Sequence, residues 1–407
     1  MAVPKVRIKG FNADWKTAKI GTVAPITGGY AFQSNCFVNN GVPIVRISNI
    51  LDSGVVGGDF AFYDSFPGDE QFKLHKDDIV IAMSGATTGK VAIIKDDKTY
   101  YQNQRVGKFS KTGKVDYSYL STIVGSDKFL RELYRLLTAS AQPNASSKDI
   151  DSISIPVPQY KNEQEAIALY FSNLDSLIQS TTKKIESLKL VKAASLQSMF
   201  PQEGETKPRV RFKGFNDEWK IKQLSECLSI SNETNVDNRY GKDDVLSVSD
   251  EVGVVNQIKY LGRSFAGKSV TNYGVLKTGQ IVYTKSPLKA KPYGIVKQNL
   301  GDSGIVSVLY AIYDAKEDVD AGYIHYYFDP AWRLNEYIRP LVNKGAKNTM
   351  NISDETTLEG YITIPSFAEQ KLIAEYFSNL DKQISIQEQR LEKLKQIKSA
   401  CLKNMFV

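Results

Sequence analysis

The feature that most constrains the fold of this chain is an internal repeat. The segment Pro4–Gly21 matches Pro208–Ser225 at nine of eighteen positions, and Glu163–Phe200 matches Glu369–Phe406 at nineteen of thirty-eight. The two matches are offset by 204 and 206 residues, so the chain is a tandem duplication. Each copy holds a short basic leading segment, a variable region of about 140 residues and a long terminal segment. The two variable regions share almost no identity.

The terminal segments predict long helices that pair through an apolar seam. Seam positions alternate spacings of three and four residues in both copies, and neither Gly nor Pro interrupts them. We expect a central helix over residues 161–200 and a C-terminal helix over 366–407, each roughly 57 Å long and antiparallel to the other. Two separate surface helices remain the alternative. The expected helix-pairing residues are Phe171, Leu174, Ile178, Ile185, Leu188, Phe377, Leu380, Ile384, Leu391 and Leu394.

The variable regions predict compact mixed α/β domains. β-branched runs bounded by Gly and Asp indicate strands at Val42–Ile50, Asp77–Gly85 and Lys90–Asp96, with counterparts at Val245–Ser249, Gly279–Lys285 and Tyr293–Asn299. A helix is expected after them, around Tyr117–Leu137 and Ala321–Leu341. The fold class is therefore α/β (mixed α+β), with two globular domains, a pair of long antiparallel helices and a pseudo-twofold tandem repeat.

These features divide the chain into five segments. The first globular domain with its basic leading segment covers residues 1–160, and the central helix 161–200. A polar linker, 201–207, precedes the second globular domain with its leading segment, 208–365. The C-terminal helix covers 366–407.

Composition narrows the class of protein. No apolar run approaches the ~18–20 residues of a membrane span, and the N-terminus lacks a signal-peptide core, so we expect a cytoplasmic protein without a membrane partner. Three distant cysteines and two histidines argue against a disulfide framework or a metal site. The net charge is +7, yet residues 17–162 carry 16 basic and 14 acidic residues, and 223–368 carry 15 and 17. Any anionic partner must therefore be bound by local patches.

Motifs for reaction chemistry are incomplete. Ser84–Lys90, SGATTGK, has three residues between its glycines and Val after the lysine, which departs from a phosphate-binding loop. Asp329–Trp332, DPAW, lacks the second proline of the amino-methyltransferase tetrapeptide. His75 and His325 lie in different repeats without a partner acid or nucleophile. We therefore expect no catalysis and no cofactor. Ser84–Lys90 is better interpreted as a hairpin tip that presents hydroxyls, backbone N–H groups and a lysine.

Several polar, basic segments have the residue types that read DNA. Arg, Lys, Asn and Gln can bind guanine and adenine edges with two hydrogen bonds, and further lysines neutralise phosphate. Solvated polar loops remain the alternative for any one segment. The candidate DNA-binding residues are Arg46, Ser48, Asn49, Ser84, Thr87, Thr88, Lys90, Gln102, Asn103, Gln104, Arg105, Gln142 and Asn144 in the first region, and Lys285, Lys289, Lys291, Tyr293, Lys297, Lys344, Lys347 and Asn348 in the second.

The duplicated layout and its motifs resemble the DNA-specificity subunit of type I restriction–modification systems. Both long helices begin with YFSNLD preceded by IPVPQYKNEQ or IPSFAEQ, and the first region holds VPIVRISNI, LHKDDIVIAMSGATTGK, YYQNQ and SAQPNASSKDI. The second region departs, since VYTKSPLKAKPYGI replaces the Ser-Gly-Ala-Thr loop and NKGAKNTMNIS replaces SAQPN.

The resemblance implies a non-catalytic subunit that binds double-stranded DNA in defence against foreign DNA. Its two target-recognition domains would each read one half of a bipartite, asymmetric site. The paired helices would act as a coiled-coil spacer and dock two methyltransferase (modification) subunits and two restriction (translocase–nuclease) subunits. Readers on one face of B-DNA lie ~34–36 Å apart, a distance that helices of this length can span. The alternative is a non-catalytic coiled-coil scaffold whose variable domains bind protein partners. The incomplete motifs disfavour a solitary methyltransferase or nuclease.

Overall fold

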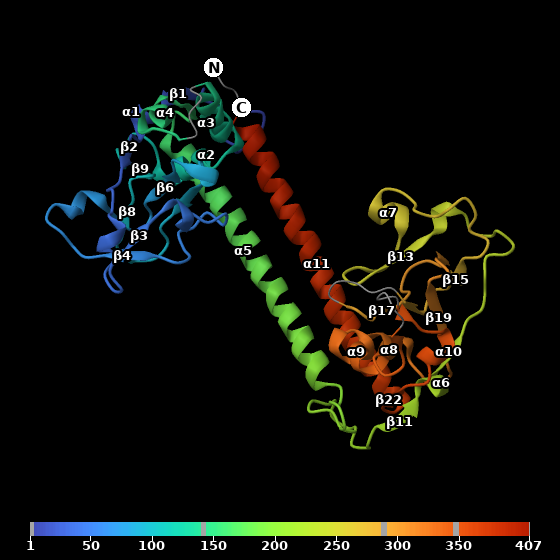
Figure 1. Cartoon of the computed structure of the whole chain (residues 1–407). Coiled ribbons are helices and arrows are strands. Elements are labelled where there is room, and N and C mark those ends of the chain that lie inside the picture. Colours follow the sequence, from blue (N-terminus) through green and yellow to red (C-terminus); the bar gives the residue numbers. More distant parts are fainter. Residues whose placement is uncertain (1–3, 140–143, 286–290, 345–349, 407) are drawn as a thin grey trace. The chain divides into compact units, whose positions relative to one another are not determined.

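The computed structural model describes residues 4–139, 144–285, 291–344 and 350–406. The chain forms two compact units (Figure 1): unit 1 holds Met1–Thr182 and Gln389–Val407, and unit 2 holds Lys183–Glu388. Two long helices, α5 (Lys161–Ser198) and α11 (Phe367–Met405), each contribute one part to either unit.

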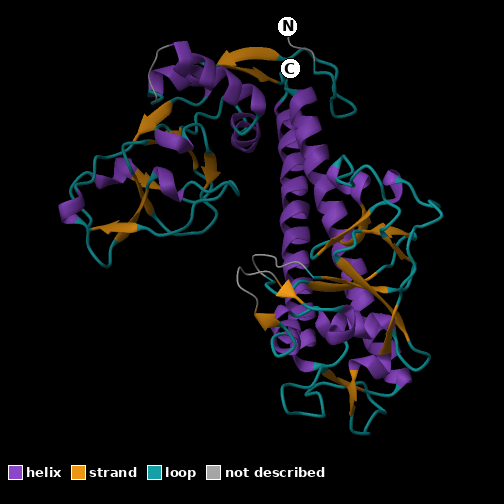
Figure 2. Ribbon diagram, turned by 45° about the vertical axis from the view of Figure 1, so that its right-hand side comes forward, coloured by secondary structure: helices purple, strands orange, loops and turns teal. Residues whose placement is uncertain are grey.

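Unit 1 is built on two four-stranded sheets. One has the order β2-β9-β6-β7 and is antiparallel, and the other has the order β4-β3-β8-β5 with β3 and β8 parallel. A separate antiparallel pair, β1 with β10, lies at the end that carries helices α2–α4 (Figure 2). The strands are β1 (Lys16–Lys19), β2 (Ile26–Gly28), β3 (Val42–Val45), β4 (Ala61–Tyr63), β5 (Lys73–Leu74), β6 (Ile79–Ala82), β7 (Val91–Ile93), β8 (Tyr100–Gln102), β9 (Val106–Phe109) and β10 (Ser154–Val157), and the short helices are α1 (Ile20–Val23), α2 (Tyr117–Val124), α3 (Asp127–Ala139) and α4 (Ser147–Ser152), with 3-10 turns at Ser34–Cys36, Ile47–Asn49, Asp69–Phe72 and Gly85–Thr87.

Unit 2 repeats this plan with other side chains. Its main antiparallel sheet has the order β12-β19-β16-β17, and the pairs β13–β14 and β15–β18 take the place of the second sheet. The strands are β11 (Lys220–Gln223), β12 (Leu228–Ile230), β13 (Leu246–Ser249), β14 (Gly253–Asn256), β15 (Gly274–Leu276), β16 (Ile281–Thr284), β17 (Ile295–Gln298), β18 (Gly304–Val306), β19 (Tyr310–Ala315), β20 (Asn343–Lys344), β21 (Met350–Asn351) and β22 (Tyr361–Ile364), and the short helices are α6 (Leu224–Cys227), α7 (Gln257–Leu261), α8 (Ala321–Phe328), α9 (Ala331–Ile338) and α10 (Asp354–Thr357), with a 3-10 turn at Lys242–Asp244.

The central strand β6 is apolar throughout because it is covered on both faces. Ile79 and Ile81 belong to the core that includes the helices, whereas Val80 and Ala82 belong to the core beneath the second sheet. Successive side chains of a strand point to opposite faces, so a four-residue apolar run supplies two cores. In unit 2, β16 repeats this division. The predicted mixed α/β class is confirmed.

Each single helix that we expected after the strands is in fact two helices. Gly125 follows α2, and the backbone turns there before α3 begins at Asp127. In unit 2, Pro330 separates α8 from α9, since proline lacks the N–H that a continuous helix requires. The single-helix predictions over residues 117–137 and 321–341 were therefore wrong.

In both units an arginine of the leading segment forms an ion pair with a glutamate in the first turn of a long helix. Arg7 binds the buried carboxylate of Glu163 through two hydrogen bonds of 2.7 and 2.8 Å, and Arg211 binds Glu369 at the same two distances. Nearby, Trp15 packs against Phe406 and Trp219 against Phe200. These contacts are equivalent under the repeat, so both units have one framework.

The long helices pair in antiparallel fashion, which confirms that prediction. In unit 1, Tyr170 of α5 contacts Cys401 of α11 through its hydroxyl at 3.4 Å, and in unit 2 Ser195 contacts Tyr376 at 3.0 Å. Asp175 contacts Lys398 in unit 1, and Lys189 contacts Glu388 in unit 2. Within each unit, rising numbers in α5 therefore meet falling numbers in α11. Of the proposed seam residues, six are buried (Phe171, Leu174, Ile185, Phe377, Leu380 and Ile384) and four are half-buried (Ile178, Leu188, Leu391 and Leu394).

The described helices include none that is both long and apolar enough to span a membrane.

Candidate nucleic-acid interface

Four loop segments of unit 1 meet at the end of β6. The Met83 N–H donates to the Arg105 carbonyl at 2.9 Å, and the Ala145 N–H donates to the Met83 carbonyl at 2.8 Å. The 3-10 turn at Gly85–Thr87 lies beside the turn at Ile47–Asn49. We call these segments, residues 46–49, 83–90, 102–105 and 144–145, the unit 1 loop cluster. Residues up to about 100 positions apart in the sequence thus share one surface.

The hairpin tip of this cluster needs its two glycines. Gly85 and Gly89 have φ angles of +73° and +87°, a region that side chains other than glycine rarely adopt. A Cβ at Gly85 would lie 3.4 Å from Ile47 Cδ1. The motif Ser84–Lys90 is therefore a tight turn packed against its neighbour, in agreement with the hairpin interpretation.

The loop cluster exposes part of the predicted set. Ser48, Gln104, Arg105 and Asn144 are exposed, and Arg46, Thr87, Lys90 and Asn103 are half-buried. Lys90 forms an ion pair of 2.6 Å with Asp52. Asn103 accepts a hydrogen bond from the Arg105 N–H at 3.2 Å, which orders the turn that carries Arg105.

Four predicted DNA contacts of unit 1 need correction, because their side chains are buried: Asn49, Ser84, Thr88 and Gln102. Asn49 donates to the carbonyls of Gly57 and Asp59, and Gln102 donates to those of Thr27 and Val106. Thr88 donates to the Gly85 carbonyl at 2.7 Å. Asn49, Thr88 and Gln102 thus position the loops, and the buried Ser84 hydroxyl has no hydrogen-bond partner among the described residues.

In unit 2 the predicted lysines are engaged by carboxylates. Lys285 lies 2.6 Å from Asp354, Lys291 2.6 Å from Asp250, and Lys297 2.7 Å from Asp329. These charges are compensated within the protein, and the binding of DNA by Lys285, Lys291 and Lys297 stays a prediction. Tyr293 is half-buried against the unit 2 core.

Five predicted residues remain, and one of them, Lys344, lies within the described part of the chain. Lys344 lies in β20, which pairs with β21. Gln142, Lys289, Lys347 and Asn348 lie outside the described residues.

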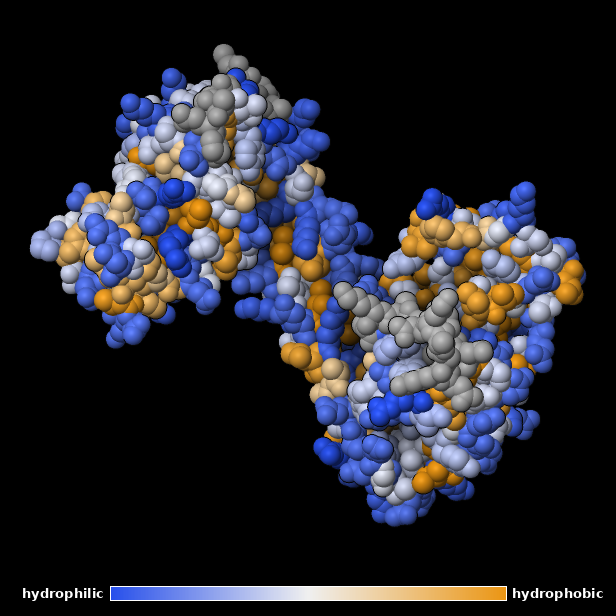
Figure 3. All heavy atoms as spheres, viewed as in Figure 1, coloured by the Kyte–Doolittle hydropathy of each residue, from blue (hydrophilic) through white to orange (hydrophobic). Residues whose placement is uncertain are grey.

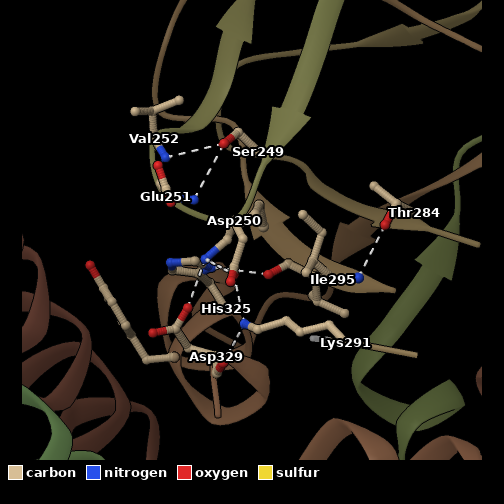
Figure 4. A network of polar contacts seen from close by, with 12 residues as sticks. Ser249, Asp250, Glu251, Val252, Thr284, Lys291, Ile295, His325 and Asp329 are labelled. Carbon is tan, nitrogen blue, oxygen red and sulfur yellow. Dashed lines mark hydrogen bonds and ion pairs between the residues drawn. The ribbon is translucent and has the colours of Figure 1, made fainter. Parts of the chain in front are cut away.

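The ion pairs of Lys291 and Lys297 share the carboxylates of Asp250 and Asp329 and form one network around the end of α8 (Figure 4). Lys291 also donates to the Asp329 carbonyl at 2.9 Å, and Lys192 of α5 lies 3.2 Å from Asp329 and 2.8 Å from Asp381. Burial alone would raise the pKa of Asp329, but Lys297 and Lys192 outweigh it and hold that pKa well below its usual range. The network therefore keeps buried charges paired and fastens the loops of unit 2 to its helices.

His325 lies within this network and is uncharged at neutral pH. Burial lowers its pKa to about 4, and the neighbouring Lys297 acts in the same direction. Its Nδ1 lies 3.3 Å from the Val296 carbonyl. Among the described residues no group of three His, Cys, Asp or Glu side chains is placed to hold a metal ion.

Comparison with known proteins shows the family to which the chain belongs. Residues 12–190 and 216–396 each match the type I restriction modification DNA specificity domain. The chain belongs to this family. The two matched segments correspond to the two copies of the repeat, so the specificity domain occurs twice.

Individual relatives agree with that assignment. The type I restriction enzyme MjaVIII specificity subunit of Methanocaldococcus jannaschii is 31% identical over 195 residues, 46% of this chain and 46% of the relative. The EcoAI specificity subunit of Escherichia coli is 30% identical over 190 residues, 45% of this chain and 31% of the relative. The chain thus aligns with less than half the length of either relative.

A crystal structure of the S subunit of a type I restriction–modification system from M. genitalium has the same fold. The TM-score is 0.59 at 14% sequence identity, over 100% of this chain and 99% of the other. The predicted family and the tandem arrangement of two specificity domains around a long helix are confirmed.

The candidate set predicted from the sequence omits one basic segment of this specificity-domain protein. Residues 257–268 of unit 2 expose Lys259, Arg263 and Lys268. The signal is present in the sequence, since no Asp or Glu occurs between Glu251 and Asp302, whereas eight Lys or Arg do. The predicted residues cover only the second half of that stretch.

Proposed function

We propose that the chain is the DNA-specificity subunit of a type I restriction–modification complex, and that units 1 and 2 each read one half of a bipartite, asymmetric site. One observation carries this proposal: the two units share one framework and differ in their loops. The Arg7–Glu163 and Arg211–Glu369 contacts are equivalent, whereas SGATTGK at the hairpin tip of unit 1 is replaced by a lysine-rich loop in unit 2. Equal frameworks with unequal loops suit unequal half-sites.

The recognition domains in this proposal are residues 1–160 and 208–365, and the central helix 161–200 and the linker 201–207 lie between them in the sequence. In the first of them, Arg105, Gln104 and Ser48 are the exposed side chains best suited to base edges. The buried Asn49 and Gln102 support the loops that carry them.

The long helices would hold the partner proteins. Val191 of α5 and Ile397 of α11 occupy equivalent positions of the repeat, and both are exposed, at 47% and 44%. An apolar side chain repeated on two helices suits two copies of one partner, which we propose to be the methyltransferase subunit. Two restriction subunits would join that assembly. The chain itself would contribute no catalytic group and would act in the cytoplasm.

The decisive test combines binding with a genomic readout. The chain is purified with its methyltransferase subunits, and binding is measured on genomic and random duplexes over a range of salt concentrations. We expect sequence-dependent binding whose affinity falls as salt rises. Methylome sequencing of hosts with and without the gene should then reveal one asymmetric bipartite motif. Binding that is absent, or independent of salt and sequence, would instead favour the protein-binding scaffold.

A further inference from the structure

A second basic surface lies on unit 2, in α7 and the loop that follows it. We propose that residues 257–268, the α7 segment, bind the phosphate backbone of the DNA duplex beside the half-site read by unit 2. This inference rests on the proposed function and adds a contact element to it.

The α7 segment carries positive charge that no carboxylate compensates. Eight basic residues lie between Glu251 and Asp302, and four of them, Lys277, Lys285, Lys291 and Lys297, pair with carboxylates. Within the described part of the chain, Lys259, Arg263 and Lys268 form no ion pair, and all three are exposed. Of the described basic residues in this stretch, only the three in the α7 segment have no carboxylate partner. Lys289 lies outside the described residues.

The α7 segment is also held in a defined shape. The Gln257 side chain donates to Ser247 Oγ of β13 at 3.1 Å, and its carbonyl oxygen accepts from the Phe265 N–H at 2.6 Å. Asn256 caps α7 by accepting from the Lys259 N–H at 3.0 Å. Gly262 ends the helix with a φ of +77°. Because the loop is already ordered, less conformational entropy is lost when it binds a ligand.

Aromatic and apolar side chains lie beside the cations of this segment. The Arg263 guanidinium lies 4.5 Å from the centre of the Phe265 ring, and that ring is 58% exposed. Tyr260 and Leu261 are exposed as well, at 46% and 48%. Hydrophilic and apolar side chains accordingly lie side by side over α7 (Figure 3). A stacked guanidinium keeps its N–H groups free at the edge, where they can reach phosphate oxygens.

The position of α7 connects it to the recognition loops of unit 2. α7 follows β14, which pairs with β13. The turn between these two strands holds Asp250. Asp250 binds Lys291, which lies between β16 and β17. β14 also lies beside β17. The α7 segment therefore follows a strand that packs against the β16–β17 hairpin, the hairpin of unit 2 that corresponds to β6 and β7 of unit 1.

Unit 1 carries no comparable basic segment between its strands β3 and β5. From Ile47 to Phe72 the sequence holds Asp52, Asp59, Asp64, Asp69 and Glu70 and no lysine or arginine. Lys73, which follows, pairs with Asp69 and Glu70. The additional backbone contact is thus expected on the unit 2 half-site only.

The test uses the full chain assembled with its methyltransferase subunits and a duplex that contains the methylated motif. Lys259→Gln, Arg263→Gln and Lys268→Gln are combined in one variant. The slope of log K against log salt is negative, and removing one phosphate contact should reduce its magnitude by about 0.9. For the triple variant we expect the magnitude to fall by about two to three. Affinity at about 0.15 M salt should fall at least tenfold, and the methylated sequence should stay the same. Hydroxyl-radical footprints should lose protection beside the unit 2 half-site only.

Two controls make the result specific. Lys16→Gln, Lys95→Gln and Lys98→Gln remove the same charge from exposed positions of unit 1 and should leave the slope unchanged. Arg263→Lys keeps the charge and should keep the slope, with a smaller loss of affinity because the planar stack is gone. The thermal unfolding of all variants should match that of the parent, since these side chains are exposed.

The outcomes separate this inference from the function on which it rests. If the parent complex binds its motif and the triple variant has the same affinity and slope, the inference is wrong and the proposed function stands. If the triple variant loses methyltransferase subunits but still binds DNA, the segment is a protein-docking surface and the inference is again wrong. If the parent complex binds no duplex, the proposed function itself fails.

Discussion

Lys192 Nζ lies 2.8 Å from Asp381 Oδ1, and this ion pair recurs in the other unit as Lys398 and Asp175 at 2.5 Å. Both pairs join α5 to α11, and the residues are related by the 206-residue repeat. Their surroundings differ, because Lys192 also contacts Asp329 and its side chain is 19% exposed, against 34% for Lys398. One chemical contact thus occurs in two environments within one chain.

The repeated pair predicts unequal costs for one substitution. Lys192→Ala leaves Asp329 buried near Asp381 with one cation fewer, and should lower the free energy of unfolding by about 3–5 kcal/mol. Lys398→Ala breaks a more exposed pair and should cost less than about 1 kcal/mol. Urea unfolding of both variants, followed by circular dichroism, measures the difference. Equal losses would show that burial does not govern these pairs.

The tryptophans that follow the leading segments predict another asymmetry. The Trp15 indole N–H donates to the Glu163 carboxylate at 3.0 Å, whereas the buried Trp219 N–H has no hydrogen-bond partner among the described residues. Trp15→Phe should therefore cost about 1.5–3 kcal/mol more than Trp219→Phe, because it loses a hydrogen bond to a charged group. Both variants lose similar apolar area, so the pair is internally controlled. Calorimetry that gives the same loss of stability for both would contradict the assignment.

The sequence was sufficient for several features that depend on local pattern, but not for the helix breaks at Gly125 and Pro330. The repeat, the long helices and the apolar strand at Ile79–Ala82 follow from spacing and side-chain type. The ion pairs of unit 2 could not be predicted in this way, since Asp250 and Asp329 are 41 and 32 residues from the lysines they bind. The burial of Gln102 could not be predicted either. Gln102 and Gln104 have the same side chain, but Gln102 lies in β8 and is buried, whereas Gln104 follows the strand and is exposed. Residue type indicates what can bind DNA, and tertiary packing decides which side chains remain available.

Arg105 is a predicted base contact whose side chain is exposed. If it reads a base edge, Arg105→Ala should cost about 1–3 kcal/mol of binding and relax the sequence preference at one position of one half-site. If it binds phosphate, affinity should fall evenly across sequences and the salt slope should decrease by about one. Competition binding with randomised half-sites distinguishes these results.

The matched control for Arg105 is Arg239→Ala in unit 2, another exposed arginine. If the half-sites are read by separate units, as we propose, Arg239→Ala should leave the preference of the unit 1 half-site unchanged. A change in that preference would contradict modular reading. An Arg105 variant with a parental binding profile would remove the turn at residues 103–105 from the interface.

His325 predicts how the stability of unit 2 depends on pH. In the folded chain its pKa is about 4, against the ordinary value of 6.5, because the ring is buried and Lys297 is close. The unfolded chain therefore binds the extra proton first, and the free energy of unfolding should fall as pH decreases from about 7 to 4. The shift corresponds to a loss of up to roughly 3 kcal/mol. The lowered pKa of Asp329 acts in a lower window, since its contribution is lost only as pH falls below about 4.

The histidine variants separate this effect from general acid sensitivity. His325→Gln cannot take up a proton in this range, so its unfolding free energy should change much less between pH 7 and 4. The only other histidine, His75, is exposed, and His75→Gln should retain the parental pH dependence. Urea unfolding at half-unit pH intervals measures all three proteins. If His325→Gln loses as much stability as the parent between pH 7 and 4, another group carries the pH dependence, and the buried histidine is not the acid-sensitive element of this network.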